Sequence, residues 1–298
     1  MARTTFEELL DAGSHFGHLK RKWNPNMAPY IFMERNGIHI IDLYKTIAKI
    51  DEAAAAMKQI TKSGKKVLFV ATKKQAKEIV AEQVKPAGMP YVTERWPGGM
   101  LTNFATIRKA VRKMSSIDKL MTSPSFENIS KRERLQIARE RAKLEKNLGS
   151  IADLSRLPAA LFVVDIVKEH IAIAEARKLN IPTFAIVDTN SDPNLVDFPI
   201  PANDDASKSI SLIIGKMVQA IEEGLMERKI DRDKRDDERE EALASGMDRD
   251  FDLDEDEDDD AVGGTQRLRA KPAAGDEETP GRKPGTRKPL GRKPAPRK

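Results

Sequence analysis

Cysteine is absent from the 298-residue chain, so neither a disulfide nor a thiolate-ligated zinc site can form in it. No stretch approaches the roughly 18 consecutive apolar residues that a membrane-spanning helix needs. The opening residues, MARTTFEELLDAG, also lack the basic-then-apolar pattern of a signal peptide. Aromatic residues make up only 5% of the chain, whereas charged residues make up 33%. We therefore expect a cytoplasmic protein with a modest core and a heavily solvated surface.

Sequence signatures of enzymes are also missing. The first two apolar runs end in IIDLYKT and VATKKQA, without the glycine pattern of a dinucleotide-binding turn or a phosphate-binding loop. No GxSxG, HExxH or cysteine nucleophile occurs. Thr72, Lys73 and Lys74 could hold an anion at a helix N-terminus, but a helix start with solvated lysines is the simpler interpretation. We expect no enzymatic activity. The alternative is an α/β nucleotide-binding enzyme or switch that uses the carboxyl edge of the strands near Thr72 and Asp188.

Short apolar runs alternate with amphipathic segments between Gly37 and about Arg228. The runs at 37–43, 65–71, 90–93, 160–165 and 181–188 predict strands, whereas DFPIPA at 197–202 is only a short apolar piece. Strands that alternate with helices indicate βαβ units and a parallel sheet covered on both faces. The expected fold is an α/β, flavodoxin-like or Rossmann-like sandwich with five parallel strands.

The segment 104–148 does not fit that alternation. Ile107, Val111, Met114, Ile117 and Met121 form one narrow apolar stripe, Thr122–Ser125 interrupts it with a proline, and a second stripe follows. This pattern predicts a protruding antiparallel coiled-coil hairpin. Its dense charge indicates either a solvated surface or an arm that reaches across a partner.

Charge is distributed unevenly along the chain. Residues 231–298 contain sixteen Lys/Arg and twenty Asp/Glu, so this segment has a net charge of −4. Because the whole chain has a net charge of +5, residues 1–230 carry a net charge of +9. A basic body suggests a polyanionic partner. The apolar periodicity stops after Ile230, where DRDKRDDEREEALASGMDRD could continue as a frayed polar helix. The acidic run DLDEDEDDD and the three Arg-Lys-Pro repeats that follow predict a disordered tail. We expect four parts: an N-terminal helix and basic/aromatic loop (1–36), an α/β core (37–103 and 149–230), the hairpin (104–148) and the tail (231–298).

Two loops could contact a nucleic acid. In HFGHLKRKWNPN the triplet Lys20–Lys22 lies beside Trp23 and a rigid Asn24-Pro25 pair, which suits phosphates and one stacked ring. An exposed basic turn is the competing interpretation. In TERWPGGMLTNF, Trp96 offers a flat ring and Arg95 a guanidinium fork, and Gly98-Gly99 permits a close approach. A plain strand-to-helix turn with a buried tryptophan explains the second loop equally well.

A metal site is a weaker hypothesis. His15 and His18 are spaced as i and i+3, Asp188 ends a predicted strand, and Asp204-Asp205 precedes the last core helix. Carboxylates and imidazoles of this kind could hold a divalent ion. Helix caps and turns explain the same aspartates more simply.

Five blocks of the sequence, in order, resemble bacterial small-subunit ribosomal protein two: HFGHLKRKWNPNM, NGIHIIDLYKT, TERWPGGMLTN, LPAALFVVD and IPTFAIVDTNSDPNLVDFPIPANDDA. The resemblance covers about Thr4 to Gly224. It implies a flavodoxin-like core with a protruding hairpin and a structural role in translation. It also implies binding to 16S ribosomal RNA between the head and body of the small subunit, and help in recruiting ribosomal protein one.

The resemblance also implies contacts with other small-subunit proteins, and it implies neither a membrane partner nor a small-molecule substrate. The matched positions expected to bind RNA or a partner are Lys20, Arg21, Lys22, Trp23, Arg95, Trp96, Gly98, Gly99, Thr102 and Asn103. Outside these matched positions, we also expect Asn24, Arg108 and Arg112 at such contacts. Family members have a cluster matching His18, Asp188, Asp204 and Asp205 that could take a structural divalent metal, although no cofactor is required. The tail lies outside the resemblance, so its role is left open.

Overall fold

The computed structural model describes residues 3–244, with side chains except at 125, 127 and 238–244. A five-stranded parallel sheet lies at its centre, with the order β5-β4-β6-β7-β8. The strands are β4 (Val67–Val70), β5 (Tyr91–Val92), β6 (Ala160–Val164), β7 (Thr183–Val187) and β8 (Phe198–Pro201). Counted along the chain this order is 2-1-3-4-5, which is that of flavodoxin-like sheets. The predicted fold class is confirmed.

One strand was assigned to the wrong sheet. The run predicted at 37–43 contains β3 (Ile38–Ile41), which pairs antiparallel with β1 (Phe16–Leu19) and β2 (Ile31–Arg35) in a separate three-stranded sheet. Asn36 and Gly37 join β2 to β3 with positive φ angles of 52° and 72°. Two such residues make the tight turn that favours a hairpin.

The fifth parallel strand is instead β8, the short apolar piece DFPIPA. Pro199 and Pro201 lack the N–H that a central strand would donate, but β8 lies at the edge of the sheet, where proline is tolerated.

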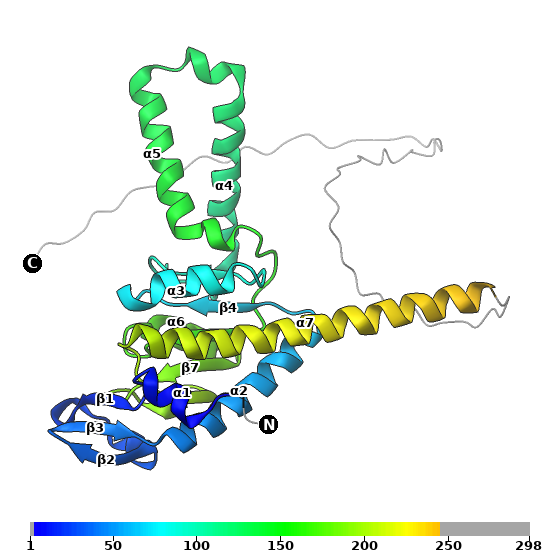
Figure 1. The fold of residues 1–298 in the computed structure, drawn as a ribbon. Coiled ribbons are helices and arrows are strands. Elements are labelled where there is room, and N and C mark those ends of the chain that lie inside the picture. Colours follow the sequence, from blue (N-terminus) through cyan, green and yellow to red (C-terminus); the bar gives the residue numbers. More distant parts are fainter. Residues whose placement is uncertain (1–2, 245–298) are drawn as a thin grey trace, which may run out of the picture. The chain divides into compact units, whose positions relative to one another are not determined.

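Helices cover both faces of the parallel sheet (Figure 1). On one face, α2 (Leu43–Lys62), α3 (Lys74–Val84) and α7 (Ser207–Ala244) pack against alternate strand residues such as Val67 and Phe69. On the other face, α6 (His170–Lys178) packs against the intervening residues such as Leu68 and Val70. The short helix α1 (Phe6–Asp11) adds Leu9 to the first core, and the 3-10 helix η2 (Pro25–Tyr30) adds Met27 to the second.

The hairpin consists of α4 (Phe104–Thr122) and α5 (Lys131–Leu148), joined by the 3-10 helix η3 (Pro124–Asn128). Figure 1 shows it projecting beyond the sheet. Met114 and Ile117 of α4 are buried. Arg141 of α5 pairs with Asp118 of α4 at 2.7 Å. The remaining 3-10 helices are η1 (Lys20–Lys22), η4 (Gly149–Ile151) and η5 (Pro193–Leu195).

Helix α7 continues to Ala244, past residue 231 where the disordered tail was expected to begin. The acidic run and the Arg-Lys-Pro repeats lie outside the described residues. Within residues 3–244, no helix combines the length and the apolar character that crossing a membrane requires.

Candidate functional site

Ionisable side chains gather at the carboxyl edge of the parallel sheet. Lys73 follows β4, Asp165 follows β6, Asp188 follows β7 and Asp204 follows β8. His18 of the small sheet joins them, because its N–H donates to the Thr189 hydroxyl at 2.8 Å beside the end of β7. Parallel strands end at a common edge, so residues distant in the sequence meet there. We call His18, Lys73, Asp165, Asp188, Asp204 and Asp205 the carboxyl-edge cluster.

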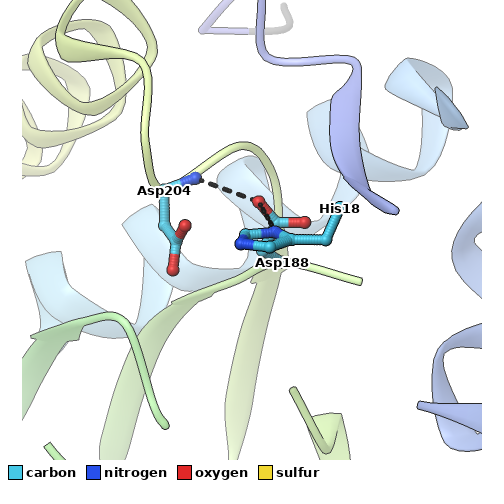
Figure 2. A group of neighbouring side chains, drawn as sticks. All are labelled: His18, Asp188 and Asp204. Carbon is cyan, nitrogen blue, oxygen red and sulfur yellow. Dashed lines mark hydrogen bonds and ion pairs between the residues drawn. The ribbon is translucent and has the colours of Figure 1, made fainter. Parts of the chain in front are cut away.

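Lys73 and His18 hold this cluster together. The Lys73 ammonium lies 2.8 Å from an oxygen of Asp204 and 3.6 Å from one of Asp165. The Nδ1 atom of His18 lies 3.1 Å from Asp188 Oδ2, an interaction marked by a dashed line in Figure 2. The Nε2 atom of His18 lies 3.6 Å from Asp205 Oδ2. Lys73 is therefore not one of the solvated lysines expected at the start of α3, since its side chain is only 12% exposed.

The charges in the cluster shift one another's pKa values. Burial, and then the negative charges of Asp188 and Asp165, raise the pKa of Asp204 above its ordinary value. The hydrogen bond with Asp188 raises the pKa of His18. Burial lowers the pKa of Lys73, but its hydrogen bonds with Asp204 and Asp205 outweigh that effect and raise it overall. Lys73 thus supplies a fixed positive charge among the carboxylates.

The residues at this edge fit a divalent metal. Ligand atoms of His18, Asp188 and Asp204 all lie within 4.8 Å of one another. Asp204 Oδ2 is buried without a hydrogen-bond partner in the described part of the chain, so one ligand oxygen faces no donor. Oxygen and imidazole ligands of this kind suit zinc or a similar ion. A bound metal would share Asp204 with the Lys73 ammonium.

The same edge is poorly suited to a nucleotide phosphate. The backbone N–H and hydroxyl of Thr72, directly after β4, both donate to the carboxylate of Glu169. Glu169 is 3% exposed, and burial raises its pKa. Donors that would face a phosphate are therefore already bonded to an acidic group. This arrangement argues against the nucleotide-binding alternative.

The first loop presents three cations on one turn. Lys20, Arg21 and Lys22 form η1 and are all exposed. Lys20 pairs with Glu34 at 2.7 Å, whereas no ion pair within residues 3–244 engages Arg21 or Lys22. The loop is fixed at its base, because the N–H of Asn24 donates to the carbonyl of Thr189 at 2.8 Å.

The other two predicted residues of this loop have structural contacts. Trp23 is half-buried, with its ring tilted against His39 at 5.1 Å between centroids. The side chain of Asn24 accepts a hydrogen bond from the N–H of Asn26 and caps η2. One part of the Trp23 ring is therefore covered, and Asn24 shapes the loop.

The second loop is organised around Glu175, a buried residue of α6. Its Oε1 accepts hydrogen bonds from Trp96 Nε1 at 3.2 Å and from the N–H of Gly99 at 2.8 Å. Its Oε2 accepts from the N–H groups of Leu101 and Thr102 at 2.9 and 3.1 Å. Burial alone would raise the pKa of Glu175, but these donors outweigh it and lower the pKa overall. A single carboxylate thus fixes the turn between β5 and α4.

Trp96 cannot serve as the stacking ring that one interpretation of this loop required. Its side chain is 6% exposed and belongs to the second hydrophobic core. The alternative of a strand-to-helix turn with a buried tryptophan fits the geometry. Gly99 has a φ of +83°, whereas Gly98 is exposed with open space around its Cα.

The remaining residues predicted at contacts lie on the surface. Arg95, Thr102 and Asn103 are exposed, as are Arg108 and Arg112 one turn apart on α4. The structure therefore brings three of the four predicted metal ligands, His18, Asp188 and Asp204, together at one edge, while Asp205 contacts only His18 among them. It fixes the two predicted RNA loops to different elements: the first to the end of β7, and the second to α6.

Sequence reasoning missed three charged residues with internal partners: Lys73, whose side chain is 12% exposed, as the internal cation, and the buried Glu169 and Glu175 as acceptors for loop donors. A signal for Glu175 was present. It occupies a position among Ala172, Ile173 and Ala176, the buried face of α6, where an acidic side chain needs a partner.

Comparison with known proteins agrees with this architecture. Residues 9–224 match the family model of ribosomal protein S2. The small ribosomal subunit protein uS2 of Porphyromonas gingivalis is 70% identical over 232 residues, which are 78% of this chain and 83% of that protein. The proteins of the same name from Phocaeicola vulgatus and Bacteroides thetaiotaomicron are 71% and 69% identical, covering 83% and 84% of their lengths. The predicted resemblance is confirmed: the chain belongs to the ribosomal protein S2 family.

Proposed function

We propose that this structural, non-enzymatic protein of the small ribosomal subunit binds 16S rRNA between the head and body of the subunit. The family of the chain and the names of its relatives support its assignment to the small ribosomal subunit. The observation that carries RNA binding is η1, where Lys20, Arg21 and Lys22 are exposed on one turn whose base is held by backbone hydrogen bonds.

The mechanism is electrostatic and depends on shape. Each phosphate that a lysine or arginine neutralises releases counterions, so affinity falls as salt rises. Arg95, Arg108 and Arg112 add exposed cations near the base of the hairpin. Folded RNA is recognised mainly through its backbone and its unpaired bases, which suits scattered basic side chains on a rigid body.

The test is the triple variant Lys20→Ala, Arg21→Ala, Lys22→Ala in filter binding to a 16S rRNA transcript over a range of salt. We expect weaker binding and a salt slope smaller by about 1–3, since each lost phosphate contact removes roughly 0.7–0.9. Lys65→Ala, Lys66→Ala, Lys85→Ala is the matched control, with the same loss of charge from exposed sites at the opposite edge of the sheet. Equal slopes for the two triple variants would contradict a contact through η1.

The small antiparallel sheet supports a second part of the proposal, recruitment of ribosomal protein one. On edge strand β2, Phe32 is 71% exposed and Met33 47%, and on β1 Phe16 is 48% exposed. Aromatic side chains and methionine are enriched at protein contacts. We expect Phe32→Ala, Met33→Ala to reduce the ribosomal protein one that sediments with small subunits, while this chain is retained. Unchanged co-sedimentation would exclude this surface.

We also propose that His18, Asp188, Asp204 and Asp205 hold a structural divalent metal. The buried, unpartnered oxygen of Asp204 supports this assignment. Added zinc should raise the unfolding temperature of the wild-type chain but not that of His18→Ala. A ligand that binds the folded chain and is present at a free concentration of 100 times its Kd adds about 2.7 kcal/mol of apparent stability. A shift of equal size in both chains would place the metal elsewhere.

A further inference from the structure

A groove lies at the base of the hairpin, between α4 and residues 151–155, which follow α5. Its volume is about 180 Å³. Its floor is apolar and comes from both sides: Ile107 and Val111 of α4, and Ile151 and Leu154 of the facing segment. Ile151 and Leu154 are 2% and 7% exposed and belong to the second hydrophobic core, so the floor is rigid.

The rim of the groove is cationic. Arg108 and Arg112 line it from α4, one helical turn or about 6 Å apart along the axis. Both are exposed, and neither guanidinium group has a hydrogen bond or ion pair among the side chains of the described residues. Arg141, on the other helix of the hairpin, is by contrast bonded to Asp118. The two guanidinium groups beside the apolar floor are therefore available to an anionic ligand.

One acidic group completes the lining. Asp153 is exposed at the groove, opposite α4. A carboxylate can accept a hydrogen bond from the exocyclic amino group of a nucleobase. An acidic peptide side chain would leave the apolar floor uncovered, and that disfavours an acidic peptide as the occupant.

We propose that this groove binds one unstacked nucleobase of RNA, with the phosphates on either side of it held by Arg108 and Arg112. The flat base covers the apolar floor, and the guanidinium groups bond to phosphate oxygens. Asp153 favours cytosine or adenine, which carry an exocyclic amino group, over uracil, which does not. This site rests on the proposed function and adds to it the kind of RNA element recognised, an unpaired nucleotide.

The experiment measures fluorescence anisotropy of labelled hexaribonucleotides of cytidine, adenosine and uridine with the full-length chain. Val111→Trp fills the groove without changing charge and should weaken binding of the cytidine hexamer about tenfold, the scale of one lost base contact. Ser115→Trp, an equally large residue at an exposed site elsewhere on α4, should bind within about twofold of wild type. Circular dichroism and unfolding temperature show whether both variants fold.

Two polar variants separate charge from base recognition. Arg108→Gln, Arg112→Gln should weaken all three hexamers and flatten the salt dependence by about 1–2. Lys109→Gln on the same helix is its control. Asp153→Asn should reduce the preference for cytidine over uridine while leaving binding of uridine nearly unchanged.

The outcomes distinguish this inference from the proposed function. If the wild-type chain binds neither 16S rRNA nor any hexamer, the proposed function fails. If it binds 16S rRNA and Val111→Trp binds the cytidine hexamer as well as wild type does, the groove assignment alone is overturned. Tighter binding of a labelled hexaglutamate peptide than of the cytidine hexamer, lost in Val111→Trp, would overturn it in favour of an acidic protein segment.

Discussion

Glu175 shows how one buried residue can position a whole loop. A charged group is costly to bury, and the cost is offset only when hydrogen-bond donors surround it. Here the donors are the Trp96 indole and backbone N–H groups of the turn that leads into α4. The loop is therefore shaped by an interaction across the fold, and its own glycines only permit that shape.

We predict that Glu175→Gln lowers the free energy of unfolding by about 2–4 kcal/mol, because an amide NH2 group would face donors that now share a carboxylate. Urea unfolding at neutral pH measures the loss. Glu140→Gln, which removes an exposed charge from the hairpin, should change stability by no more than about 0.5 kcal/mol. A Glu175→Gln variant as stable as this control would show that the carboxylate is dispensable.

The difference in unfolding free energy between wild type and Glu175→Gln should also depend on pH. The donors hold the pKa of Glu175 below its ordinary value of 4.5 in the folded chain. A lowered pKa contributes stability above the unfolded pKa, and that stability is lost as the pH falls through the folded pKa. The gap in unfolding free energy between wild type and Glu175→Gln should therefore narrow as the pH falls below 4.5. A gap that stays constant down to acid unfolding would contradict this assignment.

Gly17 and Gly98 differ in what surrounds them. A Cβ at Gly17 would lie 2.5 Å from a methyl of Thr189 and 2.9 Å from the carbonyl of His39, whereas none of the described atoms lies within 4 Å of one at Gly98. Gly17→Ala should separate β1 from the end of β7 and cost about 1–3 kcal/mol. Gly98→Ala should stay within about 0.5 kcal/mol. Thermal unfolding of both variants checks the contrast, and equal midpoints would contradict it.

At the scale of elements, the pattern of apolar residues predicted most of the fold. Short apolar runs between amphipathic segments predicted the parallel strands β4, β6 and β7, because such strands are buried on both faces. Narrow apolar stripes predicted the hairpin, because each of its helices buries one side only. The small antiparallel sheet was missed although Asn36-Gly37 is a strong hairpin signal, because the strand that follows also begins an α/β pattern. The internal contacts of Lys73 and Glu169 could not be recognised, because their partners come from distant segments. For Glu175 the sequence indicated only its position on the buried face of α6.

The hairpin should open independently of the sheet. Its seam depends on few buried residues, among them Met114 and Ile117, each 8% exposed. We predict that Ile117→Ala destabilises the hairpin locally by about 2 kcal/mol. Amide hydrogen exchange should then speed up in 104–148 and stay unchanged in β6 and β7. Ser115→Ala on the exposed side of α4 is the control, and faster exchange throughout the sheet would show that the two parts unfold as one unit.

At the scale of the whole molecule, charge of opposite sign is separated along the chain. Residues 1–230 carry a balance of +9, and the run 252–260 contains eight acidic residues. Acidic groups on the same chain compete with phosphates for basic side chains, and they act most strongly on binding that lacks specific contacts. We predict that the acidic run acts as an internal competitor and limits binding to unrelated RNA.

Replacing these eight residues by Asn and Gln tests that role. Binding of the neutral variant to an unrelated RNA of similar length should tighten by about tenfold at low salt, with a steeper salt slope, because competition for the cations is removed. Binding to 16S rRNA should change less, since shape-specific contacts add to charge there. A chain with residues 252–260 shuffled keeps the charge and should behave as wild type. If the neutral variant and the shuffled chain bind unrelated RNA equally, the acidic run does not compete for the basic body.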